Sequence, residues 1–93
     1  MDLQELRDNL NEIDNQIIAL FKKRMGISLE VAKYKEQNNM NVLDTARERE
    51  LLNRIAEMAG DELDHYARIL YTTIMDISRS YQHTYLSRDS VLT

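Results

Sequence analysis

The sequence predicts an all-α fold in which three helices, one long and two shorter, form an intertwined homodimeric bundle. The chain of 93 residues contains no proline and two glycines, and it is rich in residues that favour helices. Apolar residues recur at alternating spacings of three and four along its first third. A first helix of that extent runs on the order of 50 Å, whereas a compact domain of this size is roughly 30 Å across. The overhanging apolar surface needs a partner, and a second copy of the chain is the expected one.

Composition narrows the function classes. The net charge of −4 argues against a nucleic-acid or anionic-membrane partner. The absence of cysteine rules out disulfides and thiolate sites and fits a reducing compartment. No apolar run is long enough to span a membrane and no signal peptide is recognisable, so we expect a cytoplasmic protein. The two histidines lie far apart without a paired acidic pattern, and no metal site is expected.

The first helix is predicted from Met1 to about Asn38, with a cation inside its apolar seam. After six apolar residues the seam reaches Arg24, where another apolar residue is expected. Burying a cation is costly unless an anionic group contacts it. Arg24 is therefore the first indication of a bound ligand. Gly26, inside the same helix, costs about 1 kcal/mol relative to alanine. The seam consists of Leu3, Leu6, Leu10, Ile13, Ile17 and Leu20 before Arg24, and of Ile27, Val31 and Tyr34 after it.

Two further basic residues of this helix have alternative interpretations. Arg24, Ser28 and Lys35 fall on one stripe, because four and eleven residues turn the helix by about 40° and 20° net. Taken alone, Lys35 is better explained as a solvated lysine near the helix C-terminus, where the helix dipole favours a cation. Arg7 lies on the far half of the helix and could reach only the pocket of a partner chain. On spacing alone Arg7 is better explained as an ordinary surface arginine.

The second and third helices follow after short connections. Asp44 or Thr45 can cap the second helix and Gly60 ends it, while Asp61 is expected to cap the third. The apolar pattern fades after Tyr85, so we expect a domain over residues 1–86 and a frayed tail or the start of a linker over residues 87–93. The expected inner faces are Leu51, Leu52, Ile55 and Ala59 in the second helix, and Leu63, Tyr66, Ala67, Leu70, Ile74, Ile77 and Tyr81 in the third.

Several polar residues of these helices do not fit a plain amphipathic pattern. Asp44 and Glu48 are explained by capping and by the helix dipole, but Arg47 opposes that dipole. Ser78 and Gln82, four residues apart, either hydrogen-bond internally or face a cavity, and both interpretations stay open.

This inventory suits a compact anion that carries more than one carboxylate. The sequence contains no Ser-His-Asp set, no Gly-rich phosphate loop and no nucleotide fingerprint. A reaction that needs only folding of the substrate and stabilisation of shifting charge would fit the remaining cations, carboxylate, amide and hydroxyl.

Four motifs in order resemble one family, the AroQ-class chorismate mutases. They are L-R-x-x-[LI]-x-x-[LI]-D at Leu6 to Asp14, K-R-M-x-I-S-x-E-V-A-x-Y-K at Lys23 to Lys35, V-L-D-x-x-R-E-R-E at Val42 to Glu50, and I-S-R-x-Y-Q at Ile77 to Gln82. The resemblance implies an intertwined homodimer with two shared active sites. It also implies a cofactor-free Claisen rearrangement of chorismate to prephenate, a step of phenylalanine and tyrosine biosynthesis.

The resemblance also implies roles at the ether bond and the carboxylates. Arg24, together with Arg7 of the partner subunit, holds the two substrate carboxylates. Lys35 bonds a carboxylate and the ether oxygen, and Gln82 donates to the same oxygen. No metal and no cofactor take part.

The remaining implied contacts lie around the substrate ring. Glu48, with the backbone near Asp44, holds the ring hydroxyl. Arg47 orients the acidic groups around it, and Ser78 contacts a carboxylate.

Two alternative functions follow from the same residues and the same fold. An isochorismate-pyruvate lyase shares the fold and much of the pocket, and a non-catalytic helical dimerisation or regulatory module would use only the apolar seam. Because the family also occurs fused to prephenate dehydratase, residues 87–93 could begin a linker.

Overall fold

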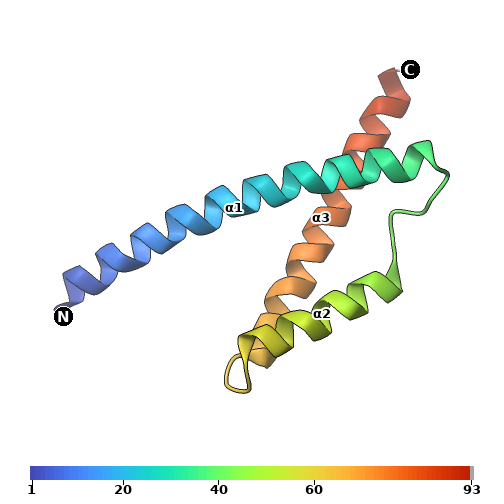
Figure 1. Cartoon of the computed structure of the whole chain (residues 1–93). Coiled ribbons are helices and arrows are strands. Elements are labelled where there is room, and N and C mark those ends of the chain that lie inside the picture. Colours follow the sequence, from blue (N-terminus) through green and yellow to red (C-terminus); the bar gives the residue numbers. More distant parts are fainter. Residues whose placement is uncertain (93) are drawn as a thin grey trace.

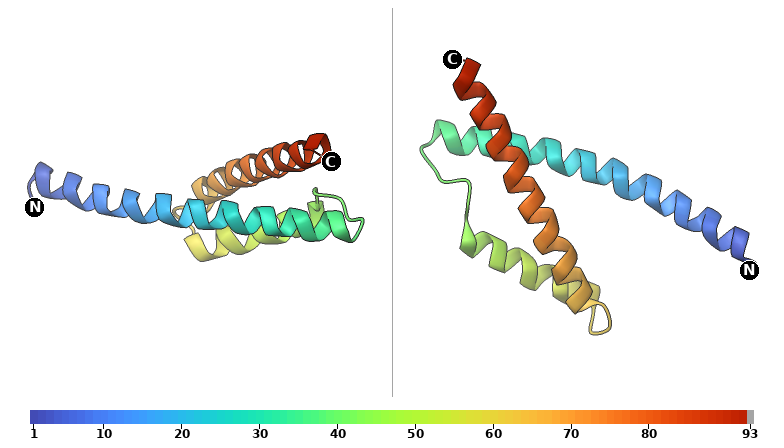
Figure 2. Two further views of the ribbon diagram at one scale, coloured as in Figure 1. Left: turned by 90° about the horizontal axis from the view of Figure 1, so that it is seen from above. Right: turned by 180° about the vertical axis from the view of Figure 1, so that it is seen from behind.

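The computed structural model describes the backbone of residues 1–92 and the side chains of residues 1–86, and the described residues form three helices without a strand. Helix α1 spans Leu3–Gln37, α2 spans Thr45–Ala59 and α3 spans Asp64–Leu92 (Figure 1). The C-terminal half of α1 crosses α3, and α2 packs beside α3 on the same side as α1 (Figure 2). The all-α prediction is confirmed. Among the described residues no helix has the length and apolar character needed to cross a membrane.

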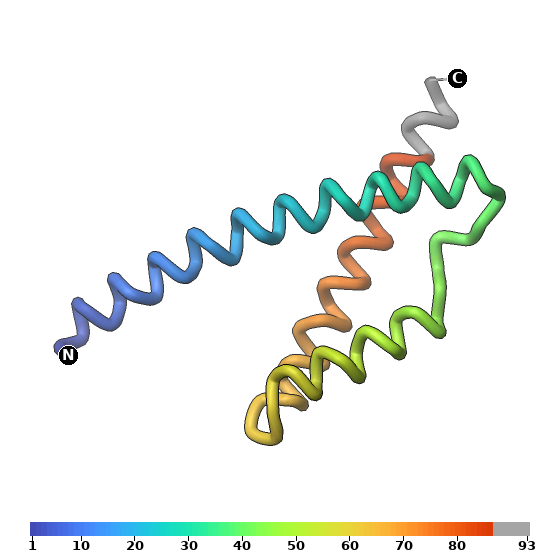
Figure 3. Tube along the Cα trace, viewed as in Figure 1, coloured from blue at the N-terminus to red at the C-terminus, as the bar shows by residue number. Residues whose placement is uncertain are grey.

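The ends of α1 follow from local side-chain chemistry. The Asp2 carboxylate accepts a hydrogen bond from the Glu5 backbone N–H at 2.8 Å, which satisfies one free donor of the first turn. At the other end Asn39 adopts a left-handed conformation with φ 56°, as the predicted helix end near Asn38 requires. Residues 38–44 then make a wide connection to α2, which Figure 3 follows.

The boundaries of α2 match the prediction, whereas the start of α3 does not. Asp44 caps α2 by accepting from the Arg47 backbone N–H at 3.0 Å, and Gly60 follows the last turn with φ 82°. The prediction that Asp61 caps the third helix is wrong. Asp61 lies in the turn before the helix, and α3 begins at Asp64, whose backbone N–H donates to the Gly60 carbonyl at 2.8 Å.

The third helix also extends further than the apolar pattern indicated. It continues to Leu92, past Tyr85, where the pattern fades. The expectation of a frayed tail or linker over residues 87–93 stays a prediction, because their side chains and all of Thr93 lie outside the described residues.

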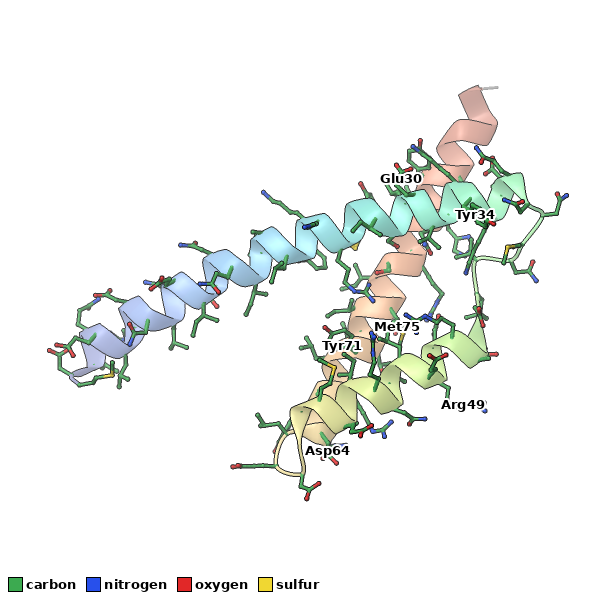
Figure 4. All side chains as sticks on the ribbon, viewed as in Figure 1. Glu30, Tyr34, Arg49, Asp64, Tyr71 and Met75 are labelled. Carbon is green, nitrogen blue, oxygen red and sulfur yellow. The ribbon has the colours of Figure 1, made fainter. Side chains whose placement is uncertain are left out.

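The core lies between α2 and α3. Leu51, Ile55 and Met75 are buried there, each burial contributing about 1.5–3 kcal/mol. Tyr71 packs against this cluster, and Figure 4 shows Tyr71 and Met75 on the side of α3 that faces α2. Leu52 and Ala67 complete the cluster.

Helix α1 meets α3 through small and polar side chains. Ala32 is fully buried in this contact region. Lys33 of α1 lies with its ammonium 5.1 Å from the centre of the Tyr85 ring of α3. A hydrogen bond to Tyr85 and the nearby Glu30 carboxylate raise the pKa of Lys33 above its ordinary value. The contact between the Lys33 ammonium and the Tyr85 ring therefore helps to join the two helices.

The face that α3 turns toward its own chain differs from the predicted one. The inward stripe is Tyr71, Met75, Ser78 and Gln82, of which the last three are buried. In the predicted inner face only Ala67 and Ile74 are partly covered. The other five members, Leu63, Tyr66, Leu70, Ile77 and Tyr81, are exposed in the single chain.

The N-terminal half of α1 extends away from α2 and α3 (Figures 1 and 2). As a result the chain measures 56 × 29 × 14 Å with a radius of gyration of 16.8 Å, against about 12 Å for a compact chain of this length. The seam of this half, Leu3, Leu6, Leu10, Ile13, Ile17 and Leu20, is exposed throughout. One chain thus leaves two long apolar stripes uncovered, one on α1 and one on α3.

Candidate active site

All three helices contribute to a pocket of about 160 Å³ between the C-terminal half of α1, the start of α2 and the middle of α3. Seven of the eight predicted site residues line it, and only Arg7 does not. The lining consists of Arg24 and Lys35 from α1, Val42 and Asp44 from the connection, Arg47, Glu48 and Leu51 from α2, and Met75, Ser78, Arg79 and Gln82 from α3.

Arg24 and Lys35 bring two cations to this pocket from the same stripe of α1. Arg24 Nη1 donates to Ser78 Oγ at 3.3 Å, and its guanidinium lies 5.9 Å from the centre of the Tyr71 ring. Lys35 Nζ donates to the Val42 carbonyl at 2.9 Å. Neither cation forms an ion pair within the described part of the chain. Both side chains are partly buried. Because no carboxylate of the described residues pairs with them, their positive charge is available for an anionic ligand.

Ser78 and Gln82 combine the two interpretations that the sequence left open. Both are buried, with 7% of each residue exposed, and both line the pocket. Gln82 Nε2 donates to the Ser28 carbonyl of α1 at 2.7 Å. A primary amide has two N–H donors, so this bond fixes the side chain and leaves one N–H for a ligand. Gln82 is thus an oriented donor in a largely dehydrated place.

The start of α2 contributes groups of both signs. Asp44 Oδ1 accepts from the Arg47 N–H and the Asp44 carbonyl accepts from the Glu48 N–H at 3.0 Å, so within the described residues Oδ2 and the backbone N–H of Asp44 remain for a ligand. Arg47 Nη1 lies 3.6 Å from Glu50 Oε1 in an exposed ion pair, which is weak and easily exchanged for another partner. Glu48 points toward α3 and forms an ion pair with Arg79.

Arg79 is a pocket residue that is not among the predicted site residues. It lies within the I-S-R-x-Y-Q motif and lines the pocket, but the resemblance implies no role for it. Its spacing offered a signal, since Arg79 is four residues beyond Met75 and three before Gln82 and so shares their face of α3.

Arg7 lies on the exposed N-terminal half of α1, outside the pocket. A second hollow of about 310 Å³ adjoins the pocket and shares Arg24, Arg47 and Gln82 with it. Among the described residues this hollow is lined by no cation besides the two arginines that it shares with the pocket.

The charge balance defines what the pocket can hold. Four cations and two carboxylates line it, and Arg79 and Arg47 already have acidic partners. The arrangement suits a small ligand with two anionic groups and a polar atom within reach of Lys35 and Gln82. Among the described residues no group of three histidine, aspartate or glutamate side chains is placed to hold a metal ion.

Comparison with known proteins identifies relatives along nearly the whole chain. The sequence model for chorismate mutase type II matches residues 6–83. A chorismate mutase of Methanocaldococcus jannaschii is 28% identical over 86 residues, covering 90% of this chain and 87% of the relative. The bifunctional chorismate mutase/prephenate dehydratase of Escherichia coli K12 is 32% identical over 88 residues, covering 92% of this chain. This chain spans only 23% of that longer protein.

Proposed function

Because the chain belongs to the chorismate mutase type II family, we propose that its three-helix pocket is the active site in which chorismate rearranges to prephenate. The observation that carries the proposal is the pair of cations, Arg24 and Lys35, which line one pocket without an acidic partner among the described residues. The substrate is a dicarboxylate, so its two negative groups match this unpaired charge.

The pocket first acts on the shape of the substrate. The rearrangement breaks the ether C–O bond and forms a C–C bond within one molecule, so no proton and no covalent enzyme intermediate is needed. Its main requirement is that the side chain folds over the ring before reaction. The planar guanidinium of Arg24 holds a carboxylate in a fixed orientation, which supports this compact geometry.

The second contribution is electrostatic. As the ether bond breaks, negative charge grows on its oxygen. Lys35 and the free N–H of Gln82 donate to that oxygen and therefore interact more strongly with the transition state than with bound chorismate. Because the Ser28 carbonyl already orients the Gln82 amide, little reorganisation is required when the charge develops.

The remaining residues fix the ring and the carboxylates. Glu48 and the backbone at Asp44 hold the ring hydroxyl, and Ser78 contacts a carboxylate beside Arg24. Arg47 can leave Glu50 and turn toward the acidic groups of the substrate, because its ion pair is exposed.

We further propose that the active protein is a homodimer with shared sites. The exposed seam of α1 and the exposed stripe of α3 support association, since apolar stripes of this length are normally covered. In that dimer the overhanging half of α1 enters the other subunit's site, and Arg7 of the partner subunit supplies the second carboxylate contact. A cytoplasmic location, expected from composition, stays a prediction, and so does the assignment of residues 87–93 as a frayed tail or the start of a linker.

The test is to mix the purified protein with chorismate and measure prephenate formation against the uncatalysed rate in buffer. We expect catalysis, and we expect Lys35→Met to remove most of it. Formation of salicylate and pyruvate from isochorismate, without turnover of chorismate, would instead indicate the lyase. A protein that is folded yet neither turns over chorismate nor gains thermal stability from a dicarboxylate transition-state analogue would be a non-catalytic helical module.

A further inference from the structure

Arg79 joins two carboxylates from different helices at the edge of the pocket. Its Nη1 bonds Oε2 of Glu48 in α2, and its Nη2 bonds Oδ1 of Asp76, one turn earlier in α3. Arg79 and Glu48 are partly buried, with 26% and 24% of their side chains exposed, whereas 62% of the Asp76 side chain is exposed. The network therefore runs from the surface of α3 into the pocket.

The ion pair determines which part of Glu48 faces a ligand. Oε2 is occupied by Arg79, and within the described residues Oε1 takes part in no hydrogen bond or ion pair. Both residues line the pocket. A carboxylate held through one oxygen has lost most of its rotational freedom, so its other oxygen is a fixed acceptor for a hydroxyl group.

The same pair removes an electrostatic conflict. Glu48 adds a negative charge to a pocket that must admit a dianion, and an unpaired carboxylate there would repel it. The adjacent guanidinium of Arg79 offsets that charge. Asp76 lies on the solvent side of the guanidinium and binds its second nitrogen, Nη2. This contact keeps the guanidinium in place beside Glu48.

We propose that Arg79 is a positioning residue that orients Glu48 to accept a hydrogen bond from the substrate hydroxyl and neutralises Glu48 toward the substrate carboxylates. This inference rests on the proposed function, since Glu48 has this role only if the ligand is chorismate. The hydroxyl does not change charge during the rearrangement, so the contact contributes to ground state and transition state alike.

The experiment is a double-mutant cycle with Arg79→Met and Glu48→Gln, read as KM and kcat on chorismate. For Arg79→Met we expect KM to rise about 10-fold while kcat changes less than about 2-fold, the pattern of a lost uniform binding contact. In the Glu48→Gln background the same substitution should change KM by less than about 2-fold, because the residue through which Arg79 acts has been altered. Arg79→Lys should recover most of the affinity, since it keeps a cation beside Glu48.

Arg49→Met is the matched control, because Arg49 follows Glu48 in sequence but lies exposed on the outer side of α2 (Figure 4). It removes the same charge and should leave KM unchanged. Should Arg79→Met fail to fold, Arg79→Gln enters the same cycle. A KM effect that persists in the Glu48→Gln background would overturn the proposal and make Arg79 a direct substrate ligand. Unchanged kinetics in an active Arg79→Met enzyme would also overturn it, whereas an inactive parent protein would contradict the proposed function instead.

Discussion

Replacing Gln82 by methionine separates what this side chain does for folding from what it does for the reaction. The substitution keeps the length and much of the volume, so it leaves no large cavity at this buried position. It removes the hydrogen bond to the Ser28 carbonyl, worth about 1 kcal/mol of folding free energy. It also removes the N–H that we assign to the ether oxygen. By analogy with oxyanion-hole donors that loss raises the barrier by about 3 kcal/mol, or roughly 100-fold in kcat.

Two measurements check this prediction on the same protein sample. Chemical denaturation at a fixed protein concentration should show the small loss of stability, and the initial rate of chorismate consumption at saturating substrate should show the large loss of kcat. Gln37→Met, an equivalent change at an exposed position of α1, should alter neither. If Gln82→Met lowers stability as expected but keeps kcat within about fivefold of the parent, Gln82 is a packing residue and the electrostatic mechanism is wrong.

Three further predictions address the dimer, the first helix and the core. An equal mixture of Arg7→Ala and Lys35→Ala chains, each nearly inactive alone, should recover about a quarter of parental activity. Random pairing makes half of the dimers heterodimers, and each heterodimer has one intact site out of two. Activity no higher than that of the separate variants would exclude a shared site. Gly26→Ala should raise the free energy of unfolding by about 1 kcal/mol, because a Cβ there meets nothing within 4 Å in the single chain; a loss of stability in denaturation would show that another subunit packs at this point. Ile55→Ala should lower that free energy by about 2–5 kcal/mol, while Met58→Ala on the exposed side of α2 should change it by less than about 0.5 kcal/mol in the same assay.

The helix boundaries that the sequence predicted well depend on local chemistry. Asp44 and Gly60 act through hydrogen bonds and backbone conformations within one turn of themselves, so their residue types are sufficient evidence. The wrong assignment of Asp61 has the same local origin. Two acids, Asp61 and Asp64, stand near the start of α3, and only the turn that closes onto the Gly60 carbonyl decides between them.

The inner face of α3 could not be predicted because this helix is apolar on more than one side. Leu70 and Ile77 lie on one side, Tyr71 and Met75 on another, and both follow a helical period. Periodicity identifies apolar stripes but does not tell which one packs within the chain and which one remains for association. In the structure the stripe with Tyr71 and Met75 packs within the chain.

The sequence predicts two cations of the candidate site, Arg24 and Lys35, but it does not predict the ion pair between Arg79 and Glu48. Arg24 stood out because a charge interrupted an apolar seam, and Lys35 followed from the same helical stripe. The spacing of Arg79 places it on the same face of α3 as Met75 and Gln82, but it does not indicate what Arg79 does there. Its meaning depends on Glu48, which is 31 positions earlier in the chain and on another helix, so only the tertiary contact reveals it.

The isolated N-terminal half of α1 also has a consequence for hydrogen exchange. A single helix that touches no other element is only marginally stable in water, because helices in proteins owe most of their stability to packing. Backbone amides of residues 3–16 should therefore be protected only while subunits are associated, whereas those around Leu51 and Ile55 are protected by the core within the chain. Diluting the protein should accelerate hydrogen exchange at the amides of the N-terminal half of α1 before it affects the amides around Leu51 and Ile55. The exchange rate of the N-terminal amides therefore reports subunit dissociation.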